Sequence, residues 1–401
     1  MPEANTDYRR IGENVRRARH YRGMTLDQLA GLIGRSKSWL SRVENGVLPL
    51  EKRRDIAAIA DALQVSASDL LGEGASMIPR MRGYGDLTRL REVLLGSRLT
   101  SPPDVPARPL EELTAVANGP LLAARRASDH IAQSRLLPDL IAELHVHVNT
   151  GDEQTKARAL RLLIDACAAA TFLLRNNSRW ELAWIAADRA VQAAEMLGDP
   201  IAAAEAAFPA AHAQLSVGRS RALRETGRVA DSIEAHLGDD RRAHQVYGML
   251  RLSAALAAVI DGDHTAAGEQ ADEAARIADR IGDHADAWQW FGPANVAVWQ
   301  CMLAVETGEP GRALQRVETA DLSMLPQGRR SALHIELARA HAMLGNTREF
   351  VQELRAAERL DPPRVHHNPL VRELVSTQLE RARRATGARD LRGLAYRIGV
   401  V

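Results

Sequence analysis

Residues 23–46, GMTLDQLAGLIGRSKSWLSRVENG, have the pattern of two short helices joined by a tight turn. Thr25 can cap the first helix, and Gln28 three residues later completes a capping box. Apolar residues then recur at helical spacing, at Leu26, Leu29, Ala30 and Ile33. Ser36 is placed to cap the second helix, and Gly46 to end it. The stretch therefore predicts two short helices packed against each other.

The second of these helices has one apolar face and one hydrogen-bonding face. Leu40 and Val43 must point inward, so the opposite face presents Lys37, Ser38, Ser41, Arg42 and Asn45. None of these side chains is acidic. A helix of this kind fits the major groove of DNA, where such side chains can meet base edges. We therefore expect the second helix to read a DNA duplex.

At this point the chain resembles the lambda-repressor-like, or xenobiotic-response-element, family of helix-turn-helix regulators. The resemblance covers about residues 8–71, with the turn, cap, core and exit signals in register. The matching residues are Ile11, Gly12, Arg19, Gly23, Thr25, Leu29, Ala30, Ser36, residues 41–46, Pro49, Ile56, Ile59, Ala60, Leu63, Val65 and Leu70. The resemblance implies a DNA-binding domain of five helices at residues 1–72.

The resemblance also implies a role for individual side chains. Base contacts are expected from three residues of the second helix, and phosphate contacts from its cap, its end and the following loop. Arg19 would pair with Glu44 and so brace the recognition helix. For Trp39, packing at the domain edge or on a sugar-phosphate and stacking on a base both stay open. The base-reading residues would be Lys37, Ser38 and Arg42, and the full expected set is Ser36, Lys37, Ser38, Trp39, Ser41, Arg42, Asn45 and Lys52.

The charge of the chain is distributed unevenly. The formal net charge of all 401 residues is +1. Residues 1–54 hold twelve Lys or Arg and six Asp or Glu, a net charge of +6, which leaves −5 for the remainder. Positive charge concentrated on the segment with the recognition pattern is the electrostatic footprint of a nucleic-acid-binding domain.

Length and composition predict a soluble protein of two or three folding units, since 46% of 401 residues are hydrophobic. Cys167 and Cys301 lie far apart in apolar helical stretches and are expected to be buried and reduced. The N-terminus is polar and no apolar run approaches 18 residues, so we expect a cytoplasmic protein without membrane contact.

Residues 73–109 are expected to be a linker with one short helix near residues 86–95. Gly, Pro and Ser without periodicity precede this helix, and the Pro-rich segment 101–109 follows it. From residue 110 to residue 401 helical periods dominate and no strand pattern occurs, so an all-α second domain is predicted.

A repeat organises this second domain. Gly218, Gly262, Gly308 and Gly345 each precede an alanine by twelve residues, and Ser178 does so in a fifth copy. The alanines are Ala190, Ala230, Ala274, Ala320 and Ala357. Each unit has the pattern of a helix, a turn and a second helix, and such pairs must stack to bury their apolar faces. The repeat resembles the tetratricopeptide repeat in a lengthened form, which predicts an α-solenoid at residues 110–401. We expect a divergent first pair at 110–150 and a terminal capping pair near 369–384 and 388–398.

Stacked helix pairs form a concave groove that usually binds peptides or partner segments. Aromatic residues crowd at positions 285–300, where Pro293 is expected to kink or interrupt the helix. The candidate effector-binding residues are Trp288, Phe291, Asn295 and Trp299, with packing in the core between repeats as the alternative. Further candidates for the groove are His212, Gln245, Tyr247, His334 and His341.

Signals for catalysis are poor. His145 and His147 would lie on different faces of a helix without a third ligand, and residues 261–263 lack the later ligands of a calcium loop. We therefore expect no enzyme activity, cofactor or metal. Together the features predict a homodimeric transcriptional regulator that binds a palindromic operator in double-stranded DNA and senses a peptide or small molecule. Such a two-part chain resembles actinobacterial regulators. The alternative is a scaffold, whose repeats hold another protein while the N-terminal domain localises it on DNA.

Overall fold

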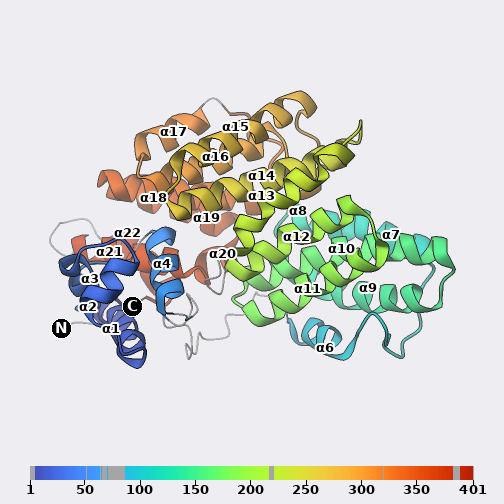
Figure 1. The fold of residues 1–401 in the computed structure, drawn as a ribbon, viewed down its shortest axis with the longest axis horizontal. Coiled ribbons are helices and arrows are strands. Elements are labelled where there is room, and N and C mark those ends of the chain that lie inside the picture. The colour runs from blue at the N-terminus through green and yellow to red at the C-terminus, as the bar shows by residue number, and fades with distance from the viewer. Residues whose placement is uncertain are drawn as a thin grey trace.

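The computed structural model describes residues 5–50, 52–63, 65, 70, 86–215, 221–318, 320–382 and 389–400. Figure 1 shows a small N-terminal group of helices beside a long series of stacked helices. The described residues contain no β-strand, apart from one isolated bridge between Arg98 and Ser101. The predicted all-α architecture, with a small N-terminal helical domain followed by helical repeats, is confirmed.

The N-terminal domain begins with four helices, and the cap of the second follows the sequence pattern. The Thr25 hydroxyl accepts from the Gln28 amide at 3.2 Å, and the Gln28 side chain accepts from the Thr25 amide at 2.8 Å. The expected fifth helix lies outside the described residues, except for Val65 and Leu70; Leu70 is buried in the domain core. The helices are α1 (Asn5–Tyr21), α2 (Leu26–Leu32), α3 (Lys37–Glu44) and α4 (Arg53–Leu63).

Five helix pairs follow in series and form the solenoid, a name used here for α10 to α19. In the last four pairs the second helix is amphipathic, as stacked pairs require. The pairs are α10 (Glu153–Asn176) with α11 (Trp180–Leu197), α12 (Pro200–Leu215) with α13 (Arg221–Ile233), α14 (Arg241–Asp261) with α15 (His264–Ile281), α16 (Pro293–Thr307) with α17 (Pro310–Glu318), and α18 (Gln327–Leu344) with α19 (Thr347–Leu360).

The repeat signal holds at most of its positions. Gly262, Gly308 and Gly345 end α14, α16 and α18 with left-handed φ of 84°, 86° and 79°. Gly218 lies outside the described residues. Four of the alanines are fully buried on the second helix of a pair, namely Ala190, Ala230, Ala274 and Ala357. The expectation for Ala320 is wrong, because α17 ends at Glu318 and the buried small residue of that helix is Ala313.

Both ends of the solenoid carry extra helices. Before it lie α6 (Thr88–Gly96), α7 (Leu110–Val116), the π-helical turn η1 (Ala117–Leu121), α8 (Leu122–Arg126) and α9 (His130–Thr150); after it lie α20 (Pro362–His366), α21 (Pro369–Ala382) and α22 (Arg389–Arg397). The last two occupy the positions expected for the capping pair. Within the predicted linker 73–109, α6 packs its leucines into the core shared by α9, α10 and α11.

The helices of the second domain curve until early and late segments meet. Arg126, at the end of α8, donates to the carbonyls of Ala285 at 2.8 Å and Met324 at 3.1 Å. His130 Nε2, at the start of α9, lies 3.1 Å from Asp361 Oδ1 beside α20. In Figure 1, α8 lies between the helices α9 to α12 and the later helices of the stack, and it contacts both α9 and α18. The curved stack therefore encloses an interior space.

Candidate nucleic-acid interface and central cavity

Helix α3 has the two faces that its sequence predicts. Ser36 caps it by accepting from the Trp39 amide at 3.1 Å. Leu40 and Val43 are buried against α1 and α2. The outer face exposes Lys37, Ser38, Arg42 and Asn45, while Ser41 is half-buried. Hydrogen-bonding side chains thus stand on the solvent side of a well-anchored helix.

The expected brace of this helix is present. Arg19 Nε donates to Glu44 Oε1 at 2.6 Å, and Arg19 Nη2 donates to Glu44 Oε2 at 2.8 Å. The hydrogen bond to Glu44 raises the pKa of Arg19 despite burial. The remaining Nη1 of Arg19 donates to the Met24 carbonyl, in the turn before α2. The bidentate pair therefore ties α1 to the end of α3 and to the turn between the helices.

Two outer residues of α3 already have partners within the domain. Lys37 Nζ lies 2.6 Å from Asp27 Oδ2, and both side chains are mostly exposed. Asn45 Oδ1 accepts from Arg16 Nη2 at 2.6 Å. An exposed ion pair such as Lys37–Asp27 contributes only about 0–1 kcal/mol, so a phosphate or a base edge can replace the partner of Lys37.

Trp39 lies at the edge of the domain core. Its side chain is half-buried and packs against the core residues, and the Arg35 guanidinium stacks over its ring at 5.1 Å from the centroid. Arg35 in turn pairs with Asp55 of α4 at 2.5 Å. This arrangement favours the packing interpretation of Trp39 over base stacking.

Lys52 lies away from α3, at a junction between the N-terminal domain and the solenoid. A methyl group added at Gly308 would lie 3.6 Å from Lys52 Nζ, and one added at Gly262 would lie 3.3 Å from Arg54 Nη2. These glycines cap α16 and α14, so two cations face the carbonyl ends of two solenoid helices. Positive charge at a helix C-terminus is favourable. Ala57 of α4 also packs into the core of the solenoid around α14.

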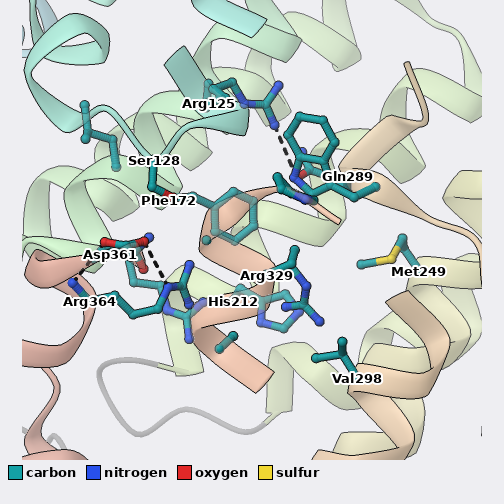
Figure 2. A pocket seen from close by; sticks show the side chains of 18 of the residues that line it. Arg125, Ser128, Phe172, His212, Met249, Gln289, Val298, Arg329, Asp361 and Arg364 are labelled. Atoms are coloured by element: carbon teal, nitrogen blue, oxygen red, sulfur yellow. Dashed lines mark hydrogen bonds and ion pairs between the residues drawn. The ribbon is translucent and has the colours of Figure 1, made fainter. Parts of the chain in front are cut away.

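A cavity of about 190 Å³ lies inside the curve of the second domain. Figure 2 shows side chains from many helices converging on it, including Arg125 of α8, Phe172 of α10, His212 of α12, Met249 of α14 and Arg329 of α18. No single repeat forms this cavity, because each helix contributes only one or a few of the residues that line it.

Arg125 and Arg329 border the cavity, and their hydrogen bonds among the described residues go to the side-chain amide oxygens of Gln289 and Asn295, not to a carboxylate. Arg329 Nε donates to Asn295 Oδ1 at 2.8 Å, and its guanidinium lies over the Trp299 ring. Burial, with the positive charge of Arg364, lowers the pKa of Arg329 to about 9. Burial also lowers the pKa of Arg125. Both pKa shifts have the same main cause: a guanidinium charge withdrawn from water, which the attraction of Glu336 for Arg329 and of Asp165 for Arg125 does not offset.

Backbone strain is concentrated at the cavity rim. Gln289 and Trp290 have φ of 47° and 62°, in the left-handed region that non-glycine residues rarely adopt. They belong to the 3-10 turn η3 (Trp288–Trp290), directly before α16. Arg125 and Arg126 stack on the Trp290 ring at 5.4 Å. Strain of about 1–3 kcal/mol per residue persists where surrounding contacts enforce it, and it clusters at functional sites.

The four predicted effector residues occupy different surroundings. Trp299 lines the cavity, and Asn295 is buried beside it, where it orients Arg329. Trp288 and Phe291 are buried in the core around α14, so for them the packing alternative fits the geometry. Pro293 does interrupt the helix, as expected, because it is the first residue of α16. Of the further candidates, His212 lines the cavity.

Sequence reasoning missed Arg125, Arg329 and Gln289 as cavity residues. Nothing distinguishes the two arginines from the many others in this Arg-rich sequence. Trp290 stood in the aromatic cluster, and that cluster was the one local signal.

The other candidate groups are structural. His145 is buried and its Nε2 accepts from Arg189, whereas His147 contacts the Arg108 carbonyl, so the two imidazoles do not converge. Cys167 and Cys301 are buried free thiols, and burial raises the pKa of each to about 12. Across the described ranges, no group of three His, Cys, Asp or Glu side chains is arranged to hold a metal ion. No helix in the same ranges is long and apolar enough to span a bilayer.

Comparison with known proteins identifies one segment. Residues 10–71 match the family described as "Helix-turn-helix domain". No curated protein matches the chain. Among solved structures, Bacillus thuringiensis PlcR in complex with the peptide PapR7 and DNA is similar at 14% sequence identity and a TM-score of 0.28, over 86% of this chain and 98% of that chain. So low a TM-score carries no argument about ligands. Residues 10–71 are thus a helix-turn-helix domain.

Proposed function

We propose that this protein is a sequence-specific DNA-binding transcriptional regulator whose second domain senses an effector. The observation that carries the proposal is the outer face of α3. Lys37, Ser38 and Arg42 stand in solvent on a helix whose inner face is fully buried and whose end is braced by Arg19. Placed in the major groove, such side chains can reach base edges.

Charge supports the same role. The net charge of +6 on residues 1–54, within a chain of net charge +1, concentrates the attraction for phosphate on the helix-turn-helix domain. Ser36 and Asn45 flank the base-facing residues at the two ends of α3, where phosphate contacts would fix its orientation. Lys52 lies next to Gly308, so a phosphate contact from Lys52 would require it to leave the end of α16.

The junction at α4 supplies a route from the cavity to the DNA-binding helices. Helices α14 and α16 line the cavity through Met249 and Trp299. The same two helices end against Arg54 and Lys52. A ligand that shifts either helix changes how α4 packs on the solenoid. It therefore changes the position of the helix-turn-helix domain relative to the solenoid. Such a difference between two states is what allosteric coupling requires.

The regulator is proposed to act as a homodimer on a palindromic operator. Two recognition helices must be about 34 Å apart to read adjacent major grooves on one side of a duplex. A modest change in the seat of the N-terminal domain would then break the match to one half-site. Sedimentation of the full chain with and without duplex would measure the stoichiometry, with two chains per operator as the expected result.

The decisive experiment uses a duplex selected by the full-length protein from a random-sequence pool, with a scrambled duplex of equal length as reference. Arg42→Ala and Lys37→Ala should each weaken binding to the selected duplex by about 1–3 kcal/mol if the contact is bidentate to a base. Both variants should bind the scrambled duplex with much smaller changes. Affinity should also fall steeply with salt concentration.

Arg316→Ala is the matched control, because it removes one exposed arginine from α17 of the solenoid. Equal affinity of Arg42→Ala and wild type for the selected duplex would contradict base reading by α3. If no duplex is enriched and a protein partner instead copurifies in stoichiometric amount, the scaffold alternative gains.

A further inference from the structure

The central cavity has an excess of positive charge along its walls. Four arginines line it, Arg125, Arg175, Arg329 and Arg364, against two carboxylates, Glu336 and Asp361. Both carboxylates are already engaged within the protein. Glu336 pairs with Arg339 at 2.6 Å, and Asp361 contacts His130 at 3.1 Å and Arg364 at 3.3 Å. Arg364 thus has its partner in Asp361, whereas the hydrogen bonds of Arg125 and Arg329 go to the amide oxygens of Gln289 and Asn295 and to no carboxylate among the described residues.

Arg329 is the best-prepared of these donors. Asn295, which is fully buried, accepts from its Nε at 2.8 Å, and the Trp299 ring lies 5.7 Å from its guanidinium carbon. These two contacts hold the guanidinium plane and leave its Nη donors for another acceptor. A planar guanidinium held in this way suits a carboxylate, which it can bind with two parallel hydrogen bonds.

Arg125 approaches the cavity from α8 and is held by the strained turn η3. Its Nη2 donates weakly to Gln289 Oε1 at 3.5 Å, and its guanidinium stacks on Trp290. Figure 2 shows Arg125, Arg329 and Arg364 entering the cavity from different elements. The strained φ angles of Gln289 and Trp290 thus serve to place a cation and an aromatic ring at the rim.

The remaining wall is apolar and aromatic. The rings of Phe208 and His212 pack in a tilted arrangement with centroids 4.6 Å apart, and the ring centroid of Phe172 lies 5.8 Å from that of Phe208. Trp299 is 4% exposed, and its indole Nε1 has no hydrogen-bond partner among the described residues. The site therefore combines cationic donors and an unsatisfied indole donor with ring surfaces, a combination that fits an amphipathic anion.

The size of the cavity limits the ligand. Its volume of about 190 Å³ exceeds the ~150 Å³ of a cavity that holds one benzene molecule. A single ring with a short acidic arm fits this volume.

We propose that the central cavity binds a small organic anion, a carboxylate carried on one aromatic or alicyclic ring, with Arg329 as the main partner of the carboxylate and Arg125 as a second positive charge. The regulatory role of such a ligand rests on the proposed function, but its binding does not. The ring would lie against Phe172, Phe208 and His212, and the carboxylate would supply the acceptor that the cavity lacks.

The test is a titration of the full chain, free of DNA, with benzoate, phenylacetate, 3-phenylpropionate and cyclohexanecarboxylate. Calorimetry and tryptophan fluorescence give two readouts, since Trp290 and Trp299 border the cavity. We expect at least one acid to bind saturably. The corresponding amide and inorganic phosphate should bind at least tenfold more weakly.

Arg329→Gln and Arg125→Gln should each weaken binding of that acid by tenfold or more, and Arg316→Gln on the solenoid surface should match wild type. Because each cavity variant removes a buried cation that pairs with no carboxylate among the described residues, its thermal midpoint without ligand should equal or exceed that of wild type. This comparison separates loss of the site from loss of the fold.

Several outcomes overturn the inference: no acid binds at millimolar concentration, acid and amide bind equally, phosphate binds better than every acid, or Arg329→Gln binds like wild type. Retained affinity for the selected duplex in any of these cases would leave the DNA-binding function standing. If the protein binds the acid but recognises no duplex, the inference stands and the proposed DNA-binding function fails.

Discussion

Lys37 Nζ lies 2.6 Å from Asp27 Oδ2, so the first residue of α3 is held by a carboxylate of α2. The proposed base reader is thus paired before any duplex arrives. Binding to DNA would exchange this exposed ion pair for a contact in the groove, and Asp27 would act as a competitor for Lys37.

Asp27→Asn should therefore raise affinity for the selected duplex. Because exposed pairs contribute about 0.2–1 kcal/mol, the gain should not exceed about fivefold. Fluorescence anisotropy on Asp27→Asn, Lys37→Ala and the double variant forms a complete cycle. If Asp27→Asn gives the same gain when Lys37 is absent, the effect is general charge repulsion from phosphate and not release of Lys37.

Glu44→Ala should destabilise the helix-turn-helix domain severely. It leaves Arg19 buried without its bidentate partner, and breaking a buried pair costs about 3–5 kcal/mol. Urea unfolding followed by circular dichroism measures the loss. Glu13→Ala, an exposed change on α1, is the control and should stay within about 0.5 kcal/mol of wild type. A small loss for Glu44→Ala would mean that Arg19 does not depend on this carboxylate.

Arg54→Ala should loosen the packing of α4 against the solenoid. It removes a cation from the C-terminal end of α14, a contact that contributes about 0.3–1 kcal/mol and up to ~2 kcal/mol when partly buried. Hydrogen exchange should show weaker protection of the amides of α4. Arg17→Ala, an exposed change on α1, should leave this protection unchanged. If protection of the α4 amides is unchanged in Arg54→Ala, the contact between Arg54 and α14 does not couple the cavity to the helix-turn-helix domain.

Gly248→Ala should destabilise the protein, because the added methyl group would lie 2.0 Å from Phe291 Cζ and would overlap the buried ring of that residue. Overpacking of this kind costs about 1–3 kcal/mol. Gly268→Ala on α15 is the matched control, since its new methyl group meets no atom within 4 Å. That change should stabilise by up to about 1 kcal/mol through helix propensity. Thermal unfolding of both variants compares the two signs directly.

The free energy of unfolding should fall at acidic pH because of His145. Burial lowers the pKa of His145 to about 4, with the charge of Arg189 acting in the same direction and the hydrogen bond to the Ile141 carbonyl opposing it. The unfolded histidine, with a pKa of about 6.5, binds more protons than the folded one between pH 6.5 and pH 4. Stability should therefore fall by about 3 kcal/mol as pH drops through this window.

His145→Gln should reduce this slope, because an amide oxygen can accept from Arg189 without titrating. Exposed His236→Gln serves as the control and should keep the wild-type slope. Urea unfolding at several pH values between 7 and 4 gives the comparison. Equal slopes for wild type and His145→Gln would assign the acid sensitivity to other groups, of which His367 is the next candidate because burial also lowers its pKa to about 4.

The local features of the helix-turn-helix segment were accessible from the sequence because they depend on near neighbours. The Thr25 capping box, the Ser36 cap and the inward faces of Leu40 and Val43 all follow from spacing along one or two turns of helix. The repeat pattern succeeded for the same reason at Gly262 and Ala274. It failed at Ala320, because α17 ends two residues earlier than the twelve-residue spacing requires.

Helical character, the register of the repeats and the exposed polar face of α3 are written in the periodicity of the chain, because a helix places residues three and four apart on one side whatever surrounds it. The cavity and the α4 junction arise only after folding. Arg125 and Arg329 are 204 positions apart, and nothing in their flanking residues relates them until the curve of the stack brings α8 and α18 together. Curvature is the sum of small rotations between many helix pairs, and no local pattern encodes that sum.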